Sequence, residues 1–313
     1  MRMGVIEWLN RPEYVYQPGK LIRRVFGRGS GRQAMQTVEL RWKLPIEIDA
    51  SEVIGRLISH HGIVEIPVVE ALFRLIDPGE AVFDVGANIG YMTAVALAAG
   101  AGKVISFEPH PFIFARLARN AERWNREPGF AGRVDIRNLA VSSEKGHAVL
   151  CVPESFAGNN GMASLEGKAR WRTFKEVEVA TATLDSVIAE TTRPVGVMKV
   201  DIEGHEYQAF KGACDSLQKR MIRDIIYECF EGADGEASKL LASYGYTIFG
   251  LRSSLAGPAL LEHLEAGKRS YGDHNLVATL DPVRLRNRMS HKGFRCLSRA
   301  AKAGAYAEAW AKH

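Results

Sequence analysis

Hydrophobic and polar positions in the middle of the chain follow two alternating periods. Short, mostly apolar runs bounded by turn residues are typical of buried strands, and the stretches between them place apolar residues at helical spacing. These runs predict strands at 81–85, 103–108, 133–141, 195–201, 222–228, 246–251 and 275–280. The helical stretches are 91–99, 110–125, 183–190, 205–220 and 236–244. Such alternation predicts a doubly wound α/β fold, with a mostly parallel sheet, an antiparallel finish and helices on both faces.

The regions around this alternation are less regular. Two further helical patterns precede the Asp-Pro-Gly turn at 77–79, whereas residues 1–45 are predicted to be irregular. The runs 147–152 and 177–182 predict a hairpin, or an edge insertion, around a polar loop at 154–166. The Gly, Asn and Ser residues of that loop suit a substrate lid, and an ordinary surface excursion explains them equally well.

Composition places the chain among globular proteins, with 46% hydrophobic and 25% charged residues. The net charge of +5 is unevenly distributed: residues 1–50 carry +4, residues 282–313 carry +7, and residues 51–281 carry −6. An acidic centre speaks against nucleic acid as the partner, because such a partner requires a basic working face. The basic C-terminal segment is expected to form a solvated helix or an arm that binds a partner. The alternative is peripheral membrane contact, which would suit a lipid-linked glycan substrate.

Cysteine usage and the chain's apolar stretches indicate a cytoplasmic protein. The four cysteines are scattered, without a CxxC pair, so we expect reduced thiols and no cysteine-built metal site. The N-terminus lacks the apolar core of a signal peptide. No window reaches the roughly 20 apolar residues of a transmembrane segment.

A glycine-containing turn after the first strand is the first concentrated chemical signal. Asp84 ends that strand, and Gly86, Asn88 and Gly90 follow in the pattern D-x-G-x-N-x-G. A dinucleotide fingerprint requires a glycine between the other two, where it lets the backbone approach a pyrophosphate. Asn88 fills the middle of this turn, so the sequence favours S-adenosyl-L-methionine, which has no pyrophosphate. The alternative is a plain strand-to-helix turn with capping acids.

The same cofactor assigns roles to residues at neighbouring strand ends. Asp84 can hold its ammonium group directly or through water, and Glu108 can accept hydrogen bonds from both ribose hydroxyls. The loop after Glu108 begins with Pro109, and Asn138 and Ala140 lie toward the end of the third strand, where we expect the adenine.

A second signal is the segment VMKVDIEGHEYQAFKG at 197–212, which puts charges at the end of a buried strand. Lys199 and Asp201 are two apart and are expected on the same side of the strand. An alcohol is a poor nucleophile, so methyl transfer to a hydroxyl requires a base or a metal. Asp201 and His205 are candidate bases. Alternatively, Asp201, Glu203 and Glu228 offer oxygen ligands to a divalent ion. Glu203 and Glu206 also suit a purely structural helix start.

The chain resembles the FkbM family of S-adenosylmethionine-dependent methyltransferases. The segments that carry the resemblance are FDVGANIGYMTAVAL, SFEPHPFIFARLARN, NLAVSSEKG and MKVDIEGHEYQAFKG, within residues 45–280. The resemblance implies a seven-stranded, Rossmann-like class I methyltransferase fold. It also implies a cofactor loop of Asp84, Gly86, Asn88 and Gly90, Glu108 as ribose ligand, Glu65 near the methionine end, and an active rim of Asp201 and Glu203. The family usually has other residues at position 205, so a catalytic His205 departs from its pattern.

From these signals we expect three regions: an N-terminal extension at 1–48, a methyltransferase domain at 49–281 and a basic segment at 282–313. The expected function is O-methylation of a hydroxyl on a sugar, a glycan or a similar small molecule. One alternative is a module that binds S-adenosylmethionine without catalysis, but the acidic rim exceeds what such a module needs. The other is a nucleic-acid methyltransferase, which requires an aromatic pocket for a flipped base.

Overall fold

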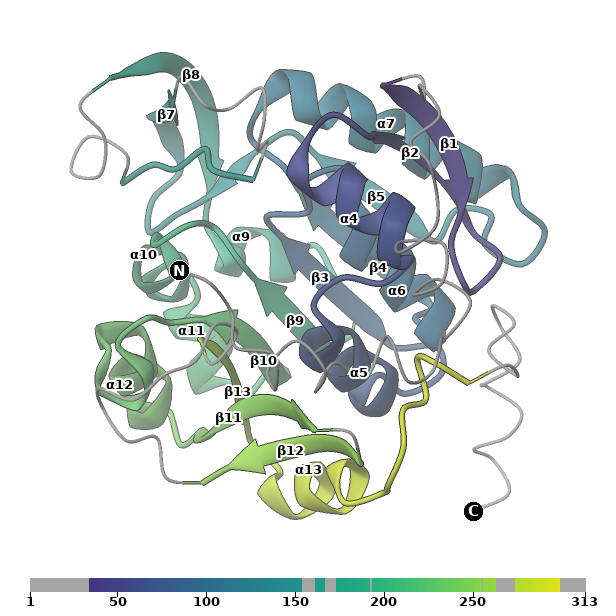
Figure 1. Cartoon of the computed structure of the whole chain (residues 1–313). Coiled ribbons are helices and arrows are strands. Elements are labelled where there is room, and N and C mark those ends of the chain that lie inside the picture. Colours follow the sequence, from purple (N-terminus) through teal and green to yellow (C-terminus); the bar gives the residue numbers. More distant parts are fainter. Residues whose placement is uncertain are drawn as a thin grey trace.

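An eight-stranded mixed sheet organises the protein, as seen in a computed structural model (Figure 1). The structure describes residues 34–153, 161–166, 173–191, 193–254, 256–262 and 274–298. The strand order is β12-β11-β13-β10-β9-β3-β4-β5. These strands are β3 (Ala81–Val85), β4 (Lys103–Phe107), β5 (Val134–Arg137), β9 (Val195–Val200), β10 (Ile222–Glu228), β11 (Thr247–Ser254), β12 (Gly257–Leu261) and β13 (Asn275–Thr279). The five strands from β10 to β5 are parallel, and β13, β11 and β12 follow with antiparallel pairing.

The parallel sheet with an antiparallel finish is therefore confirmed, but the expected count of seven strands is wrong. The eighth strand, β12, pairs with β11 at the edge of the sheet, from Gly250 opposite Leu261 to Ser254 opposite Gly257. Its short sequence, GPALL, has no alternating pattern that would have indicated a strand.

Two predicted elements are each divided in the structure. The third strand ends at Arg137, because the Asn138 side chain donates to the carbonyl oxygens of Glu108 and Pro109 at 2.8 and 3.0 Å. The chain then turns into β6 (Ala140–Val141), which pairs with β8 in a separate three-stranded sheet. That sheet contains the predicted hairpin, β7 (Gly146–Pro153) and β8 (Phe174–Ala182).

The single helix expected at 205–220 is instead α10 (Glu206–Lys211) and α11 (Cys214–Gln218). The break falls at Gly212, where a β-carbon would lie 2.1 Å from the carbonyl oxygen of Ser142. Only glycine allows the two backbones to approach so closely.

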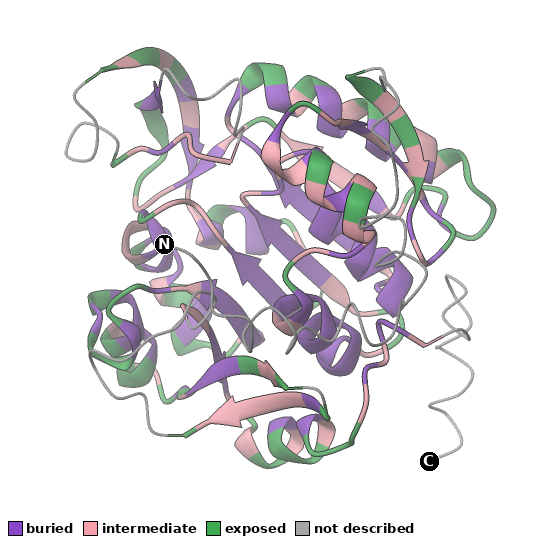
Figure 2. Cartoon of the chain, in the orientation of Figure 1, coloured by how far each residue is buried: buried purple, intermediate pink, exposed green. Residues whose placement is uncertain are grey.

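Helices cover both faces of the sheet, and each face has its own apolar core. One core joins the sheet to α5 (Ile66–Leu75), α6 (Tyr91–Ala99), α7 (Pro111–Arg126) and α13 (Pro282–Met289). The other joins it to α9 (Leu184–Ile188), α10, α11 and α12 (Glu236–Ser243), with the short helix η2 (Gly232–Asp234) before α12. Figure 2 shows the central strands almost wholly buried, as expected for a parallel sheet between two helical layers.

The region before the first predicted helix is more regular than expected. Residues 35–49 form a hairpin of β1 (Met35–Glu39) and β2 (Pro45–Asp49), so the prediction of irregular chain is wrong there. Trp42 is fully buried, and its indole N–H donates to the carbonyl oxygen of Cys296 at 3.1 Å. The start of the following helix, α4 (Val53–His61), is capped by the Glu52 carboxylate. The domain boundary at 48/49 stays a prediction, and residues 1–33 lie outside the described residues.

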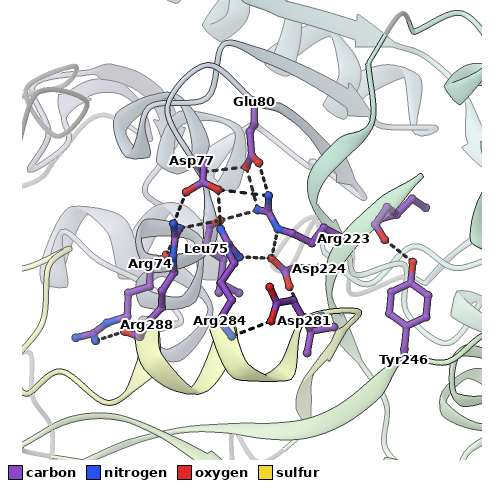
Figure 3. A network of polar contacts seen from close by, with 12 residues as sticks. Arg74, Leu75, Asp77, Glu80, Arg223, Asp224, Tyr246, Asp281, Arg284 and Arg288 are labelled. Carbon is purple, nitrogen blue, oxygen red and sulfur yellow. Dashed lines mark hydrogen bonds and ion pairs between the residues drawn. The ribbon is translucent and has the colours of Figure 1, made fainter. Parts of the chain in front are cut away.

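The described part of the basic C-terminal segment packs against the core, which corrects the expectation of a solvated helix. Leu285 and Met289 of α13 are buried against α5. Figure 3 shows the polar side of this helix. Arg284 lies 2.9 Å from both Asp77 and Asp224, and Arg288 pairs with Asp77. The charges of Arg284 and Arg288 are thus paired within the protein. Among the described residues, no helix combines the length and apolar character needed to cross a membrane.

Candidate active site

A cavity of about 640 Å³ opens beyond the carboxyl ends of the parallel strands. This is where ligands bind in doubly wound sheets, and the volume lies within the usual range for a ligand site. The predicted site residues that line it are Glu65, Gly86, Asn88, Glu108, Pro109, Ala140, Asp201, Glu203, His205 and Glu228. Both sequence motifs therefore contribute to one pocket.

Three of the predicted site residues, Asp84, Gly90 and Asn138, do not line the pocket. Asp84 is buried. A β-carbon on Gly90 would lie 2.7 Å from Leu117 and 2.8 Å from Trp124, so this glycine allows α7 to pack closely. Asn138 holds the backbone after β4, as described above. The structure thus gives Gly90 and Asn138 packing and positioning contacts.

The glycine turn brings the two motifs into direct contact. Gly86 has a φ of +81°, and a β-carbon there would lie 1.9 Å from the backbone oxygen of Asp201. Asn88 also adopts a left-handed conformation, with φ of 51°. Its side-chain oxygen accepts from the N–H of Ile89 at 2.7 Å, a local bond that suits asparagine to this conformation.

Glu108 is held in place by two backbone donors. The N–H of Asn88 lies 3.0 Å from Oε2, and the N–H of His110 lies 2.9 Å from Oε1. Burial raises the pKa of Glu108 to about 7, against the lowering effect of these two bonds. Each carboxylate oxygen retains a further lone pair, so a ribose diol can still donate to both.

The Asp84 carboxylate is only half satisfied. Thr93 donates to Oδ2 at 2.6 Å, whereas Oδ1 is buried and has no hydrogen-bond partner among the described residues. Burial raises the pKa of Asp84, and the ammonium of Lys199 opposes this shift. A buried oxygen without a donor is costly. Because Asp84 does not line the pocket, a ligand's ammonium would reach this oxygen only through water.

The second motif contributes an ion pair between a buried lysine and a half-buried aspartate to the pocket lining. Lys199 Nζ lies 3.2 Å from Asp201 Oδ2, which confirms that these side chains share one side of β9. Burial acts to lower the pKa of Lys199, but the charges of Asp201 and Asp84 outweigh it, and the pKa is raised. The ammonium therefore stays charged and compensates the surrounding carboxylates.

Two further carboxylates face the same space with raised pKa values. The Glu65 side chain is exposed to the pocket. Desolvation by the surrounding pocket walls, and then the charge of Asp201, raise its pKa. Burial and the charges of Asp201 and Glu203 raise the pKa of Glu228 to about 8. Among the described lining residues, five are carboxylates, one is lysine and none is arginine. The pocket wall thus suits a cationic ligand.

Backbone strain is concentrated around this pocket. Glu65, Asn88 and Glu203 are non-glycine residues with φ between 51° and 56°, and all three line it. The strained turn at Glu203 is stabilised by the buried Glu206, which accepts from the N–H groups of Ile202 and Gly204 at 3.0 and 3.4 Å. Strain of this kind is retained where function requires it. Glu206 thus has the structural role at a helix start that the sequence suggested, with the N–H groups of the preceding turn as its partners.

His205 lines the pocket, but both of its ring nitrogens have partners. Nε2 lies 3.0 Å from Ser142 Oγ, and Nδ1 lies 2.7 Å from Glu166 Oε1. Glu166 belongs to residues 161–166, the described end of the polar loop predicted as a lid; residues 154–160 lie outside the described residues.

The proposed metal ligands do not form a metal site. Within the described ranges, no three Asp, Glu, His or Cys side chains are grouped closely enough to hold an ion. The alternative built on Asp201, Glu203 and Glu228 therefore has no support from the geometry.

An apolar wall from α4 was not anticipated. Val53, Ile54 and Leu57 line the pocket, and Ser253 of β11 and Asn275 of β13 border it as well. The α4 helix shows a clear apolar face in the sequence, but only the fold reveals that this face covers the pocket.

Comparison with known families identifies the chain. A family model described as the methyltransferase FkbM domain matches residues 84–248, more than half of the sequence. The chain belongs to the FkbM methyltransferase family. The matched range of this FkbM protein contains the glycine turn, Glu108 and the second motif.

Two relatives are named for their reactions. The 31-O-demethyl-FK506 methyltransferase FkbM of Streptomyces tacrolimicus is 34% identical over 224 residues, which cover 62% of this chain and 83% of the relative. The hexuronic acid methyltransferase AglP of Haloferax volcanii is 30% identical over 177 residues, 56% of this chain and 66% of the relative. Among solved structures, an FkbM methyltransferase from Methylobacillus flagellatus is 18% identical, with a TM-score of 0.41. The superposition covers 65% of this chain and 44% of the other chain.

Proposed function

We propose that this FkbM protein transfers a methyl group from S-adenosylmethionine to a hydroxyl of a sugar or a similar small-molecule alcohol. The observation that carries this proposal is the joining of two motifs in one cavity. Glu108, whose oxygens are oriented by Asn88 and His110, and Asp201, from the second motif, line the same space. The relatives' names, which refer to 31-O-demethyl-FK506 and hexuronic acid, support a polyhydroxylated acceptor.

The cofactor supplies an electrophilic methyl group on a sulfonium. The protein must then orient both reactants and accept the hydroxyl proton. Asp201 is our candidate proton acceptor, since it lines the pocket and its position is fixed by Lys199. Glu203 lies beside it on the strained turn and is proposed to orient the acceptor. The apolar wall of α4 would exclude water from the reacting groups.

The proposal is tested with isotopically labelled S-adenosylmethionine and panels of neutral sugars, uronic acids and polyol natural products. Transfer is detected as labelled methyl on the acceptor by mass spectrometry, and nuclear magnetic resonance shows whether it is bound to oxygen. Label found on nitrogen or carbon, or in nucleic acid alone, contradicts the proposal.

Asp201→Asn separates binding from chemistry. We expect this variant to bind the cofactor with an affinity near that of the wild type while losing nearly all turnover. Asp135→Asn, at a carboxylate remote from the pocket lining, is the control. Full activity of Asp201→Asn removes this residue from the reaction.

A further inference from the structure

The β7–β8 sheet contributes a strap that closes one side of the pocket. Residues 161–166 run back along β7, where the backbone N–H groups of Cys151 and Ser164 each donate to the other's carbonyl oxygen, at 2.9 and 3.0 Å. Ala163 and Leu165 pack against the small apolar cluster around Ala140. This strap therefore forms the pocket wall next to Ala140, the residue expected beside the adenine.

Two polar contacts fasten the strap to the turn that follows β9. Ser164 Oγ donates to the carbonyl oxygen of Glu203 at 2.8 Å, so the strap also supports a strained pocket residue. The Glu166 carboxylate contacts Nδ1 of His205 at 2.7 Å. On its other side, His205 Nε2 contacts Ser142 at 3.0 Å.

His205 is therefore the junction of three segments that are distant in the sequence. Its side chain is mostly buried, at 8% exposed, and Ser142 lies between the β6 end and β7. A hydroxyl both donates and accepts, so the Ser142 contact persists in either protonation state of the ring. A general base, by contrast, requires a nitrogen within reach of the acceptor's hydroxyl.

We propose that His205 is a positioning residue that fastens the strap over the pocket, and that it does not remove the acceptor's proton. It acts through Glu166 and Ser142, and the fastened strap slows the exchange of the cofactor and its product. The inference rests on the proposed function only in taking this pocket as the cofactor site.

The first measurement is hydrogen exchange in the free, full-length protein. We expect His205→Ala and Glu166→Ala each to raise the amide exchange rate across residues 161–166 by roughly tenfold. Either variant removes the contact between His205 and Glu166, so the strap should open more often. Glu178→Gln, an exposed carboxylate on β8 of the same hairpin, is the matched control and should leave exchange unchanged. Exchange that stays at the wild-type level in both alanine variants overturns the proposal. Glu166 is half exposed, so its variant decides the matter if His205→Ala does not fold.

The second measurement is the dissociation rate of S-adenosylhomocysteine. Both alanine variants should release it several-fold faster, whereas His205→Asn, whose amide can still reach Glu166, should fall between them and the wild type. A residue that only accepts a proton would leave this rate unchanged, and an unchanged rate in both variants contradicts the proposal. If the wild type does not bind S-adenosylhomocysteine, the proposed function fails, while the exchange experiment still tests the fastening.

Discussion

Gly86 and Asp201 lie so close together that a β-carbon on Gly86 would be 1.9 Å from the backbone oxygen of Asp201. The contact joins the turn after β3 to the end of β9, where the N–H of Asp201 also donates to the carbonyl oxygen of Val85 at 3.0 Å. The glycine turn and the end of β9 are therefore in direct backbone contact. A substitution at Gly86 or Asp201 should therefore alter the backbone position of both residues.

Gly86→Ala should separate these two segments. The variant must relieve a backbone clash and also place alanine at φ of +81°, so we expect a loss of about 2–4 kcal/mol in the free energy of unfolding. Gly79→Ala is the matched control, because Gly79 has φ of +83° and a β-carbon there would meet no atom within 4 Å. Its cost should be about 1 kcal/mol, from the backbone conformation alone. Urea unfolding gives both values, and equal losses would show that the contact is unimportant.

Glu108→Ala should weaken cofactor binding strongly. The variant removes the acceptor proposed for the ribose hydroxyls and also releases the N–H groups of Asn88 and His110. Loss of charge-assisted hydrogen bonds predicts an affinity reduced by about 10- to 100-fold in calorimetry. Glu122→Ala, an exposed carboxylate on α7, should bind as the wild type does. Unchanged affinity in Glu108→Ala contradicts the ribose assignment.

The pocket should distinguish the cationic cofactor from its neutral product more strongly at high pH. Glu108 and Glu228, with pKa values of about 7 and about 8, are largely protonated at low pH and ionised at high pH. Each ionisation adds negative charge that attracts the sulfonium. The affinity ratio of S-adenosylmethionine to S-adenosylhomocysteine should therefore rise roughly five- to tenfold from about pH 6 to about pH 9.

The ratio isolates the sulfonium, because the two ligands share the same amino-acid and adenosine ends. Glu228→Gln should flatten the rise, since it removes the group that titrates last. The other charged groups at this wall, Lys199 and Asp201 among them, are retained in that variant. A ratio that is independent of pH in the wild type would show that these carboxylates do not interact with the sulfonium.

Glu206 should make the protein less stable as the pH rises. Burial raises its pKa from 4.5 to about 7, so between these values the unfolded chain releases the proton while the folded protein keeps it. Stability is thus present in full below about pH 4.5 and falls as the pH rises to about 7, by about 3 kcal/mol at most. Glu206→Gln lacks this titration and should gain stability relative to the wild type over that range. Urea unfolding at several pH values measures it, and a constant difference contradicts the assignment.

The sequence predicted the site best where the chemistry depends on strand ends. Glu108 and Asp201 line the pocket as predicted, because the carboxyl ends of parallel strands meet at one edge of the sheet. The pairing of Lys199 with Asp201 followed from the two-residue period of a strand. These features need only local periodicity and the order of the elements.

Features that depend on contacts between distant segments were missed. The break between α10 and α11 falls at Gly212, where the Ser142 backbone passes close by, and the link from His205 to Glu166 spans 39 residues. The C-terminal helix was predicted to be solvated because its sequence is rich in arginine. Figure 3 shows that Arg284 and Arg288 pair with Asp224 and Asp77, which are distant in the sequence. No local pattern carries such information.

Calorimetric titration of the full-length protein with S-adenosylmethionine is the most direct test of the central claim, that the cavity joining the two motifs is a cofactor site. We predict saturable binding to one site per chain, competition by S-adenosylhomocysteine, and strong weakening in Glu108→Ala but not in Glu122→Ala. Absence of binding by the folded wild type, or equal binding by both variants, would contradict it.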